Sequence, residues 1–553
     1  MRPGTALANA AWLAANVPAW RSFQRALRNP AETQRRLLVR TLRENAESAY
    51  GRAHGFAELR SPADFQRRVP IIDHADLAPW ITRIMGGEQG MLTCEPITRL
   101  LPTSGTTGGS KLIPFTAGLQ REFNRAIGPW MVDLNREHPA LALGCSYWSI
   151  SPQTAANVPP SAVPVGFDDD SAYLGGIRRR LVEATLAVSP ALRLVRSLEN
   201  NRYLTLLSLL HRPDWSFASC WHPSFLTLLL DALPSFWEEL LEDVRRGGSG
   251  RAVSEAPEVR RALSFAPQPR RAEELRRVGP QNLRAIWPGW RVVSCWGHHQ
   301  AALPLLDLQR RLPDLCVQPK GLLATEAFVS VPFQGRHPLA ICSHFFEFVD
   351  AGGTVRLSHE LAPGERYSVL VTTAGGLWRY RLGDFVEVDG LVENTPSIRF
   401  VGRGGDTSDL CGEKLAGSFV TEAVLAVCQA HGFQPPFALL APEIVPGEPP
   451  RYVLFVEGVP PEGWTAGLEQ RLRDNPHYAL CRDLGQLGAL AALTIPAGAY
   501  ETFCRVLVAE GQQLGSIKPQ SLSTRTDWRW WLAPQPSREA RRDDPADPTV
   551  AAL

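Results

Sequence analysis

Apolar residues recur every three or four positions through much of the chain, and this spacing predicts amphipathic helices. In the segment 34–50, Leu37, Leu38 and Leu42 recur at helical spacing and share one face, while arginines occupy the other faces. Ser61 followed by Pro62 predicts another helix start, because serine caps helices and proline suits their first turn. Longer helices are expected over 201–210 and 223–246, the second of which ends at two glycines.

The first residues of the chain are rich in alanine. The run from Ala6 to Val17 has the length of a secretion signal, but Asn9 and Asn16 interrupt it and no convincing cleavage site follows. We therefore expect a first helix at this end. No uninterrupted apolar run reaches about 18 residues, so the sequence predicts no membrane span.

Three runs of β-branched or alternating residues lie between the helices and predict strands. They are 291–296, 367–373 and 385–389, and glycines follow the last two. Because helices and strands alternate over most of the chain, the fold class is expected to be α/β. This part of the sequence predicts one large N-terminal α/β domain.

The glycine-rich segment 402–406 predicts a boundary after this domain. Beyond it, the pattern predicts a smaller α+β domain within the usual size range. Its elements are a helix over 419–430, a strand over 452–456, a helix over 468–484 broken near Pro476, and a strand over 503–508. The expected domains are thus 1–402 and 403–533, and the Pro-, Arg- and Asp-rich tail 534–553 is expected to be disordered.

Composition and charge narrow the class of protein. The 553 residues include 58 Lys and Arg against 56 Asp and Glu, and this net charge of +2 argues against a nucleic-acid binder. With 44% hydrophobic residues, the chain is too apolar for a disordered scaffold. Ten scattered cysteines form no CxxC pair, which favours reduced thiols in a cytoplasmic protein.

The strongest chemical signal is the loop from Thr103 to Lys111, Thr-Ser-Gly-Thr-Thr-Gly-Gly-Ser-Lys. Its glycines let backbone N–H groups turn toward one point, and its hydroxyls and lysine add donors, so it suits a polyphosphate. The spacing is not that of a Walker A loop. A solvated Ser/Thr/Gly loop is the alternative reading of this segment.

Two acidic positions offer further binding groups. Glu326, beside Thr325 in an apolar setting, is suited to Mg²⁺, whereas a structural pair with an arginine is the alternative. Asp384 ends a strand-like run after a glycine and is suited to the hydroxyls of a ribose, although such an Asp can equally belong to a turn.

Three later positions carry weaker signals. Arg403 has the planar fork that clamps a ribose or phosphate. Asp406 follows two glycines, which supply the backbone freedom of a hinge. Lys518 stands near the end of the small domain, and taken alone it has the character of a solvated surface lysine.

The order of these segments resembles the motif series of the adenylate-forming superfamily. It is most similar to the auxin-responsive Gretchen Hagen family of acyl-acid amido synthetases, in the manner of a divergent, bacterial-type member. The likeness extends from about residue 30 to 525 and is most specific in the loop at 103–111 and in 380–403. The segments 34–56, 65–87, 345–348 and 468–482 also resemble family landmarks.

The resemblance implies ATP and Mg²⁺ as cofactors and assigns a role to each position. Phosphates of ATP would lie on the loop residues Ser104, Gly105, Thr106 and Thr107. Nucleotide and Mg²⁺ would be held by Thr325 and Glu326, and ribose by Asp384 with Arg403 nearby. Asp406 would be the hinge, and Lys414 and Lys518 would approach the phosphate or acyl-adenylate, with Lys518 and Glu326 as the catalytic groups.

The resemblance also implies the reaction. A small-molecule carboxylic acid would be adenylated with loss of pyrophosphate, and an amine, typically an amino acid, would then take the acyl group. No nucleic-acid or membrane partner is expected. Ala324-Thr325 replaces a pair of serines, and Gln520 replaces an arginine, so the choice of acid and amine stays open. Two alternatives are a ligase that transfers the acyl group to a thiol and an inactive nucleotide-binding homologue.

Overall fold

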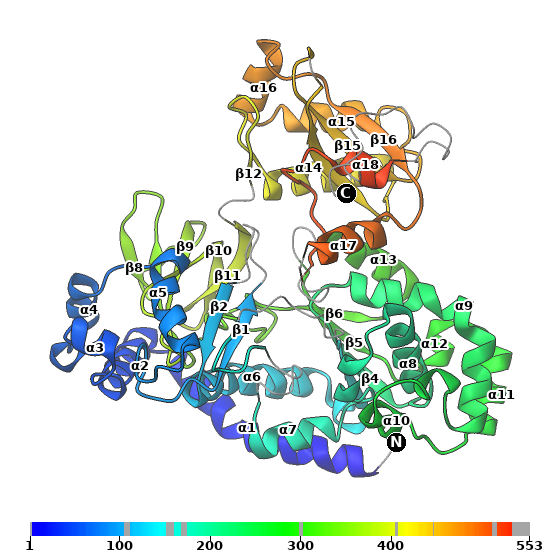
Figure 1. Cartoon of the computed structure of the whole chain (residues 1–553), viewed down its shortest axis with the longest axis horizontal. Coiled ribbons are helices and arrows are strands. Elements are labelled where there is room, and N and C mark those ends of the chain that lie inside the picture. The colour runs from blue at the N-terminus through cyan, green and yellow to red at the C-terminus, as the bar shows by residue number, and fades with distance from the viewer. Residues whose placement is uncertain are drawn as a thin grey trace. The chain divides into compact units, whose positions relative to one another are not determined.

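The computed structural model describes residues 3–103, 111–150, 160–166, 174–297, 302–403, 407–445, 447–510, 512 and 517–533. The chain divides into two compact units (Figure 1). The first consists of Met1–Gly405 with Gly511–Ile517, and the second of Asp406–Glu510 with Lys518–Leu553.

The first unit begins with helices, as the apolar periodicity predicted. They are α1 (Pro3–Ala26), α2 (Pro30–Glu44), α3 (Ala49–Ala53), α4 (Pro62–Arg68), α5 (His74–Met85) and α6 (Ala117–Glu137). The predicted start of α4 is confirmed, because the Ser61 hydroxyl accepts a hydrogen bond from the Asp64 N–H at 3.1 Å. Among the described helices, none combines the length and apolar character that a membrane crossing requires.

A parallel sheet forms the second part of this unit, and its strands lie in the order β3, β4, β5, β6. The strands are β3 (Cys145–Trp148), β4 (Trp215–Ser219), β5 (Val292–Cys295) and β6 (Cys316–Pro319). The accompanying helices are α7 (Gly176–Glu183), α8 (Leu198–Leu210), α9 (Ser224–Arg246), α10 (Pro257–Ala262), α11 (Pro269–Val278), α12 (Leu283–Ile286) and α13 (Ala302–Arg311). Figure 1 shows α8, α9, α11 and α12 gathered beside β4–β6.

An antiparallel sheet with the order β11, β10, β9, β7, β8 lies in the same unit. Its strands are β7 (Phe345–Val349), β8 (Val355–Leu357), β9 (Arg366–Thr372), β10 (Tyr380–Val392) and β11 (Thr395–Arg403). The hairpin β1 (Arg99–Thr103) and β2 (Lys111–Phe115) joins its core, which also includes residues of α2, α5 and α6. Short 3₁₀ helices lie at Phe56–Glu58, Pro139–Leu143, Pro190–Leu194 and Gly250–Ala252.

The second unit contains a short hairpin and a mixed sheet. The hairpin is β12 (Thr407–Ser408) with β13 (Leu415–Ala416), and the sheet has the order β14 (Ala438–Glu443), β15 (Arg451–Glu457), β16 (Ala491–Ile495). Its helices are α14 (Gly417–His431), α15 (Trp464–Leu472), α16 (Pro476–Asp483), α17 (Ala499–Ala509) and α18 (Trp528–Leu532). The expected break near Pro476 is confirmed, since Asn475 caps a new helix there.

The prediction of a strand over 503–508 was wrong, because this segment lies within helix α17. Phe503, Val506 and Leu507 are buried together, at the three- and four-residue spacing of one helix face. Arg505, between them, is exposed. A short apolar run suits either a strand or one helix face, and here the packing of that face decided the outcome.

Candidate active site

Thr325 and Glu326 lie at the tip of a tight chain reversal that follows β6. Leu323 and Phe328 pair as an antiparallel bridge, and the Ala324 N–H donates to the Ala327 carbonyl at 2.9 Å. The Leu322 N–H donates to the Ser330 hydroxyl at 3.0 Å, which closes the base of the reversal. Glu326 is only 4% exposed, so its carboxyl group sits in a largely desolvated environment.

A buried Glu–His pair fixes this reversal from behind. The Phe328 N–H donates to His344 Nε2 at 3.2 Å, so that nitrogen carries no proton and Nδ1 is the protonated one. Nδ1 in turn lies 2.9 Å from Glu122 Oε2, which also accepts from the Ala374 N–H at 2.9 Å. Helix α6 thereby sets the position of the segment that carries Glu326.

Asp384 occupies an irregular point of strand β10. The register of β10 against β9 shifts between Arg381 and Phe385, and Gly383 there has φ of +82°, a conformation that favours glycine. Asp384 is 6% exposed, and in the β10–β11 ladder it lies opposite Arg403. The backbones of the two positions expected to hold a ribose therefore lie side by side on neighbouring strands. The side chain of Arg403 lies outside the described part of the structure.

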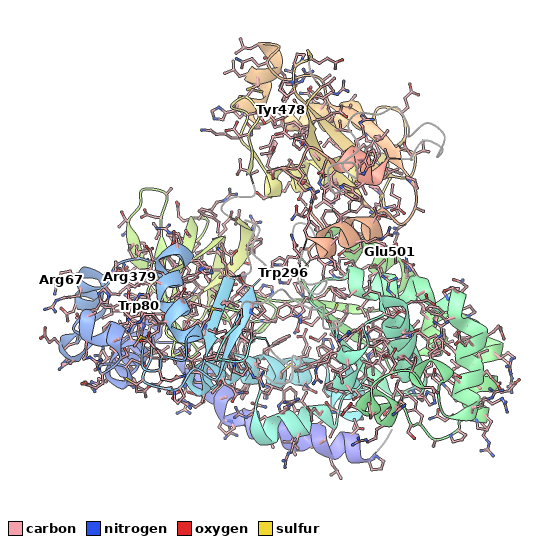
Figure 2. The ribbon with its side chains drawn as sticks, viewed as in Figure 1. Arg67, Trp80, Trp296, Arg379, Tyr478 and Glu501 are labelled. Carbon is pink, nitrogen blue, oxygen red and sulfur yellow. The ribbon has the colours of Figure 1, made fainter. Side chains whose placement is uncertain are left out.

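The start of β10 is anchored by a buried ion pair. Arg379, which is labelled in Figure 2, donates through Nε and Nη2 to the two carboxylate oxygens of Glu347 at 3.0 and 3.1 Å. The same guanidinium donates to the carbonyl oxygens of Gln66 and Val69 at 3.1 and 2.8 Å. The side chains of both partners are at most 5% exposed. Such a planar, bidentate arrangement fixes the strand that carries Asp384.

A pocket lies between the carboxyl end of the parallel sheet and strand β11. Its lining residues are Trp296, which is labelled in Figure 2, with Lys320, Gly321, Leu322, His337, Ile398, Arg399 and Phe400. Leu322 belongs to the base of the reversal that carries Glu326. Phe400 on β11 lies opposite Val386 on β10. Val386 is two residues, or about 7 Å, along β10 from Asp384. Segments neighbouring both acidic positions thus meet at one pocket.

Lys320 is a pocket residue that the sequence reasoning did not single out. Its ammonium donates to the Ser219 hydroxyl at 2.9 Å and lies 4.9 Å and 5.6 Å from the ring centroids of Trp221 and Trp130. The residue is 8% exposed, and the aromatic faces attract its charge. Its partners come from distant segments, so no local sequence signal marks this position.

Lys414 and Lys518 both belong to the second unit, and both are exposed. Lys414 ends the turn between β12 and β13 with φ of +47°, an uncommon value for a residue other than glycine. Lys518 precedes a short extended segment in which the Leu440 N–H donates to the Ser521 carbonyl at 2.8 Å. The fold therefore presents each lysine from a defined local structure.

The phosphate-loop residues Ser104, Gly105, Thr106 and Thr107 lie outside the described part of the chain, as does the expected hinge residue Asp406. The strands that frame the loop are described. Strands β1 and β2 pair in antiparallel fashion, and Thr103 at the end of β1 lies opposite Lys111 at the start of β2.

Solved structures of other proteins share this fold. The chain superposes on the solved GH3.15 acyl acid amido synthetase in complex with 2,4-DB with a TM-score of 0.83, over 93% of this chain and 96% of that one, at 20% identity. A second structure of GH3.15 acyl acid amido synthetase gives a TM-score of 0.79. The protein therefore has the fold class of these enzymes, and the expected fold class is confirmed.

Family models match the chain in three consecutive parts. The GH3 family N-terminal domain matches residues 19–312, the central domain 337–403 and the C-terminal domain 419–527. The chain belongs to the GH3, or Gretchen Hagen, family, so the predicted family is confirmed.

Named relatives agree with this membership. The chain is 28% identical to a probable indole-3-acetic acid-amido synthetase, GH3.12, of Oryza sativa subsp. japonica, over 91% of this chain and 92% of the relative. It is also 28% identical to the jasmonoyl–L-amino acid synthetase GH3.3 of the same plant, over 64% of this chain and 83% of that one.

Proposed function

We propose that this protein is an ATP-dependent acyl-acid amido synthetase that joins a small carboxylic acid to an amine, in the first instance an amino acid. The observation that carries the proposal is a pocket lined by Leu322, at the base of the reversal that carries Glu326, and by Phe400, on the strand paired with that of Asp384, in a chain that matches the GH3 models. The named relatives support the same class, because one is called a probable indole-3-acetic acid-amido synthetase and the other a jasmonoyl–L-amino acid synthetase.

The residues present fit a nucleotide with a divalent cation. Glu326 offers a nearly buried carboxylate, the oxygen ligand that Mg²⁺ takes in phosphate-transfer sites, and Thr325 adds a hydroxyl beside it. When bound, Mg²⁺ would offset negative charge on the phosphates. Ser104, Gly105, Thr106 and Thr107 would bind the phosphates, and Asp384 with Arg403 the ribose. The pocket with Trp296 and Phe400 would take a flat part of the substrates.

The chemistry follows from charge. The acid's carboxylate oxygen attacks the α-phosphorus of ATP, the bond to the β-phosphate oxygen breaks, and pyrophosphate leaves. Two anions must meet, so preorganised donors lower the barrier, and Lys518 is proposed to offset the charge that develops. The amine nitrogen then attacks the acyl carbon, loses a proton, and displaces AMP. Lys414 is proposed to contact the phosphate or the acyl-adenylate.

We assign the binding of ATP and of the acid to the domain 1–402. The smaller domain 403–533 is proposed to move about Asp406 as its hinge. Reorientation of such a domain would allow one site to serve both steps and exclude water between them. A cytoplasmic location belongs to the same proposal and is supported by ten cysteines that are all free thiols.

Asp384→Ala is expected to weaken ATP binding by about 1–3 kcal/mol, because hydrogen bonds to a charged acceptor are lost. Calorimetry on the variant measures this directly. Asp389→Ala is a matched control, since Asp389 is an exposed residue of the same strand. Equal ATP affinity in Asp384→Ala and in the parent would refute the ribose role.

Glu326→Gln is expected to raise the Mg²⁺ concentration needed for half-maximal rate by about tenfold or more, because an uncharged amide is a weaker ligand for a hard cation. The rate of pyrophosphate release across a Mg²⁺ titration measures the effect. Glu365→Gln, at an exposed position of the same unit, should leave the curve in place. An unmoved curve for Glu326→Gln would make the carboxylate structural.

A further inference from the structure

Two thiols and a carboxylate gather in the second unit. The ligand atoms of Cys411, Glu413 and Cys481 all lie within 4.8 Å of one another. Cys411 and Glu413 belong to the turn between β12 and β13, and Cys481 lies on α16, the helix that carries Tyr478 in Figure 2. None of the three is among the groups proposed for the reaction.

Backbone and side-chain donors hold the carboxylate of Glu413 in place. Oε1 accepts from the Leu410 N–H at 2.7 Å and from the Tyr452 hydroxyl at 2.6 Å, and Oε2 accepts from the Cys411 N–H at 2.9 Å. Burial alone would raise the pKa of Glu413, but these hydrogen bonds outweigh it and lower that pKa below its ordinary value. The carboxylate is therefore an oriented, ionised ligand inside the unit.

The thiols are held against the same carboxylate and turn. Cys411 Sγ donates to Glu413 Oε2 at 3.5 Å, and Cys481 Sγ donates to the Cys411 carbonyl at 3.3 Å. The side-chain amide of Asn475, at the start of α16, donates to the Glu413 carbonyl at 3.2 Å. These hydrogen bonds therefore fix the position of the turn relative to helix α16.

We propose that Cys411, Glu413 and Cys481 bind a thiophilic divalent cation of the zinc class. Two sulfurs and one carboxylate oxygen are a ligand set that Zn²⁺ takes, with water in the fourth position. Glu413 and Cys481 are buried, whereas Cys411 is partly exposed and provides a route of entry.

The charge of the site favours this assignment. As two thiols and one carboxylate, the cluster carries a charge of −1. When the ion enters, each thiol releases its proton to solvent and each sulfur forms a bond to the metal, so three anionic ligands and a 2+ ion again sum to −1. Binding therefore adds no net buried charge. Ionisation of Cys411 also removes its hydrogen bond to Oε2, which leaves that oxygen able to face the ion.

Such an ion would bear on Lys414, which directly follows Glu413 at the end of the turn. By linking the turn to α16, it would narrow the conformations that the lysine backbone, already at positive φ, can adopt. Binding of the ion does not depend on the proposed amide synthesis, so the two proposals can fail separately.

The test uses the full chain, freed of metal and reduced with a non-thiol reductant, and titrated with Cd²⁺ and then Zn²⁺. We expect one Cd²⁺ per chain to give an ultraviolet thiolate-to-metal charge-transfer band, and an excess of Zn²⁺ to reduce that band by competing for the same site. Cys411→Ser should abolish the band, and Glu413→Gln should weaken affinity by at least about tenfold. Thermal unfolding should shift upward with the ion in the parent but not in Cys411→Ser.

Cys220→Ser is the matched control, because Cys220 and Cys295 form another close thiol pair, in the first unit. That variant should retain the band. Cys411 is only partly buried, so its serine variant is expected to fold, and circular dichroism checks this. Absence of a band in the parent, or a band that survives in Cys411→Ser and disappears in Cys220→Ser, would overturn the assignment.

Discussion

Lys518→Ala is expected to slow acid-dependent exchange of pyrophosphate into ATP by about 10²–10³-fold, the cost of removing one preorganised donor from a site of developing charge. The exchange reports only the adenylation step, so loss of the amine step cannot mimic the result. Because Lys518 is exposed, its replacement should leave the free energy of unfolding nearly unchanged.

Arg505→Ala is the matched control, since it removes an exposed cation from α17 of the same unit. It should exchange pyrophosphate at the parent rate. Lys518→Arg keeps the charge but changes its shape, and an intermediate rate is expected. A parent rate in Lys518→Ala would remove this lysine from the mechanism.

Arg379→Met is expected to lower the free energy of unfolding of the first unit by about 3–5 kcal/mol, because it leaves the buried carboxylate of Glu347 uncompensated. It also removes the donors to the carbonyl oxygens of Gln66 and Val69. Urea unfolding measures this change as a shift in the urea concentration at the midpoint of the unfolding transition of the first unit.

An exposed pair on the neighbouring strands provides the comparison. Arg366 donates to Glu387 at 3.0 Å, but its side chain is 63% exposed, so Arg366→Met should cost no more than about 1 kcal/mol. Combining Arg379→Met with Glu347→Leu should recover much of the loss, since replacing both partners of a buried pair can be neutral. Similar midpoint shifts for Arg379→Met and Arg366→Met would contradict the buried-anchor account.

Local patterning predicted most of the elements because their apolar faces are local properties. The helix that ends at Leu210, the strand β9 and the restart of a helix at Pro476 all follow from residues near in sequence. The prediction failed for the segment 503–508 of helix α17, since six residues with a single arginine among apolar ones carry too little periodicity to choose between strand and helix.

The acidic positions of the site could be singled out from sequence, but what holds them could not. The reversal that carries Glu326 depends on Glu122 and His344, which are 222 residues apart. Lys320 and Ser219 are separated by 101 residues. Likewise, Cys481 meets Cys411 across 70 residues without any CxxC spacing. Contacts between residues so far apart in the chain arise from tertiary packing, and the local pattern of a single sequence does not predict them.

Product analysis distinguishes amide synthesis from the alternative reactions. The full chain would be incubated with ATP and Mg²⁺ against a matrix of carboxylic acids and amino acids, with coenzyme A in a parallel arm, and all nucleotides and conjugates would be quantified. A productive pair is expected to yield AMP, pyrophosphate and the acid–amino acid amide in equal amounts. Formation of ADP and phosphate, or of a thioester in place of the amide, would contradict this expectation.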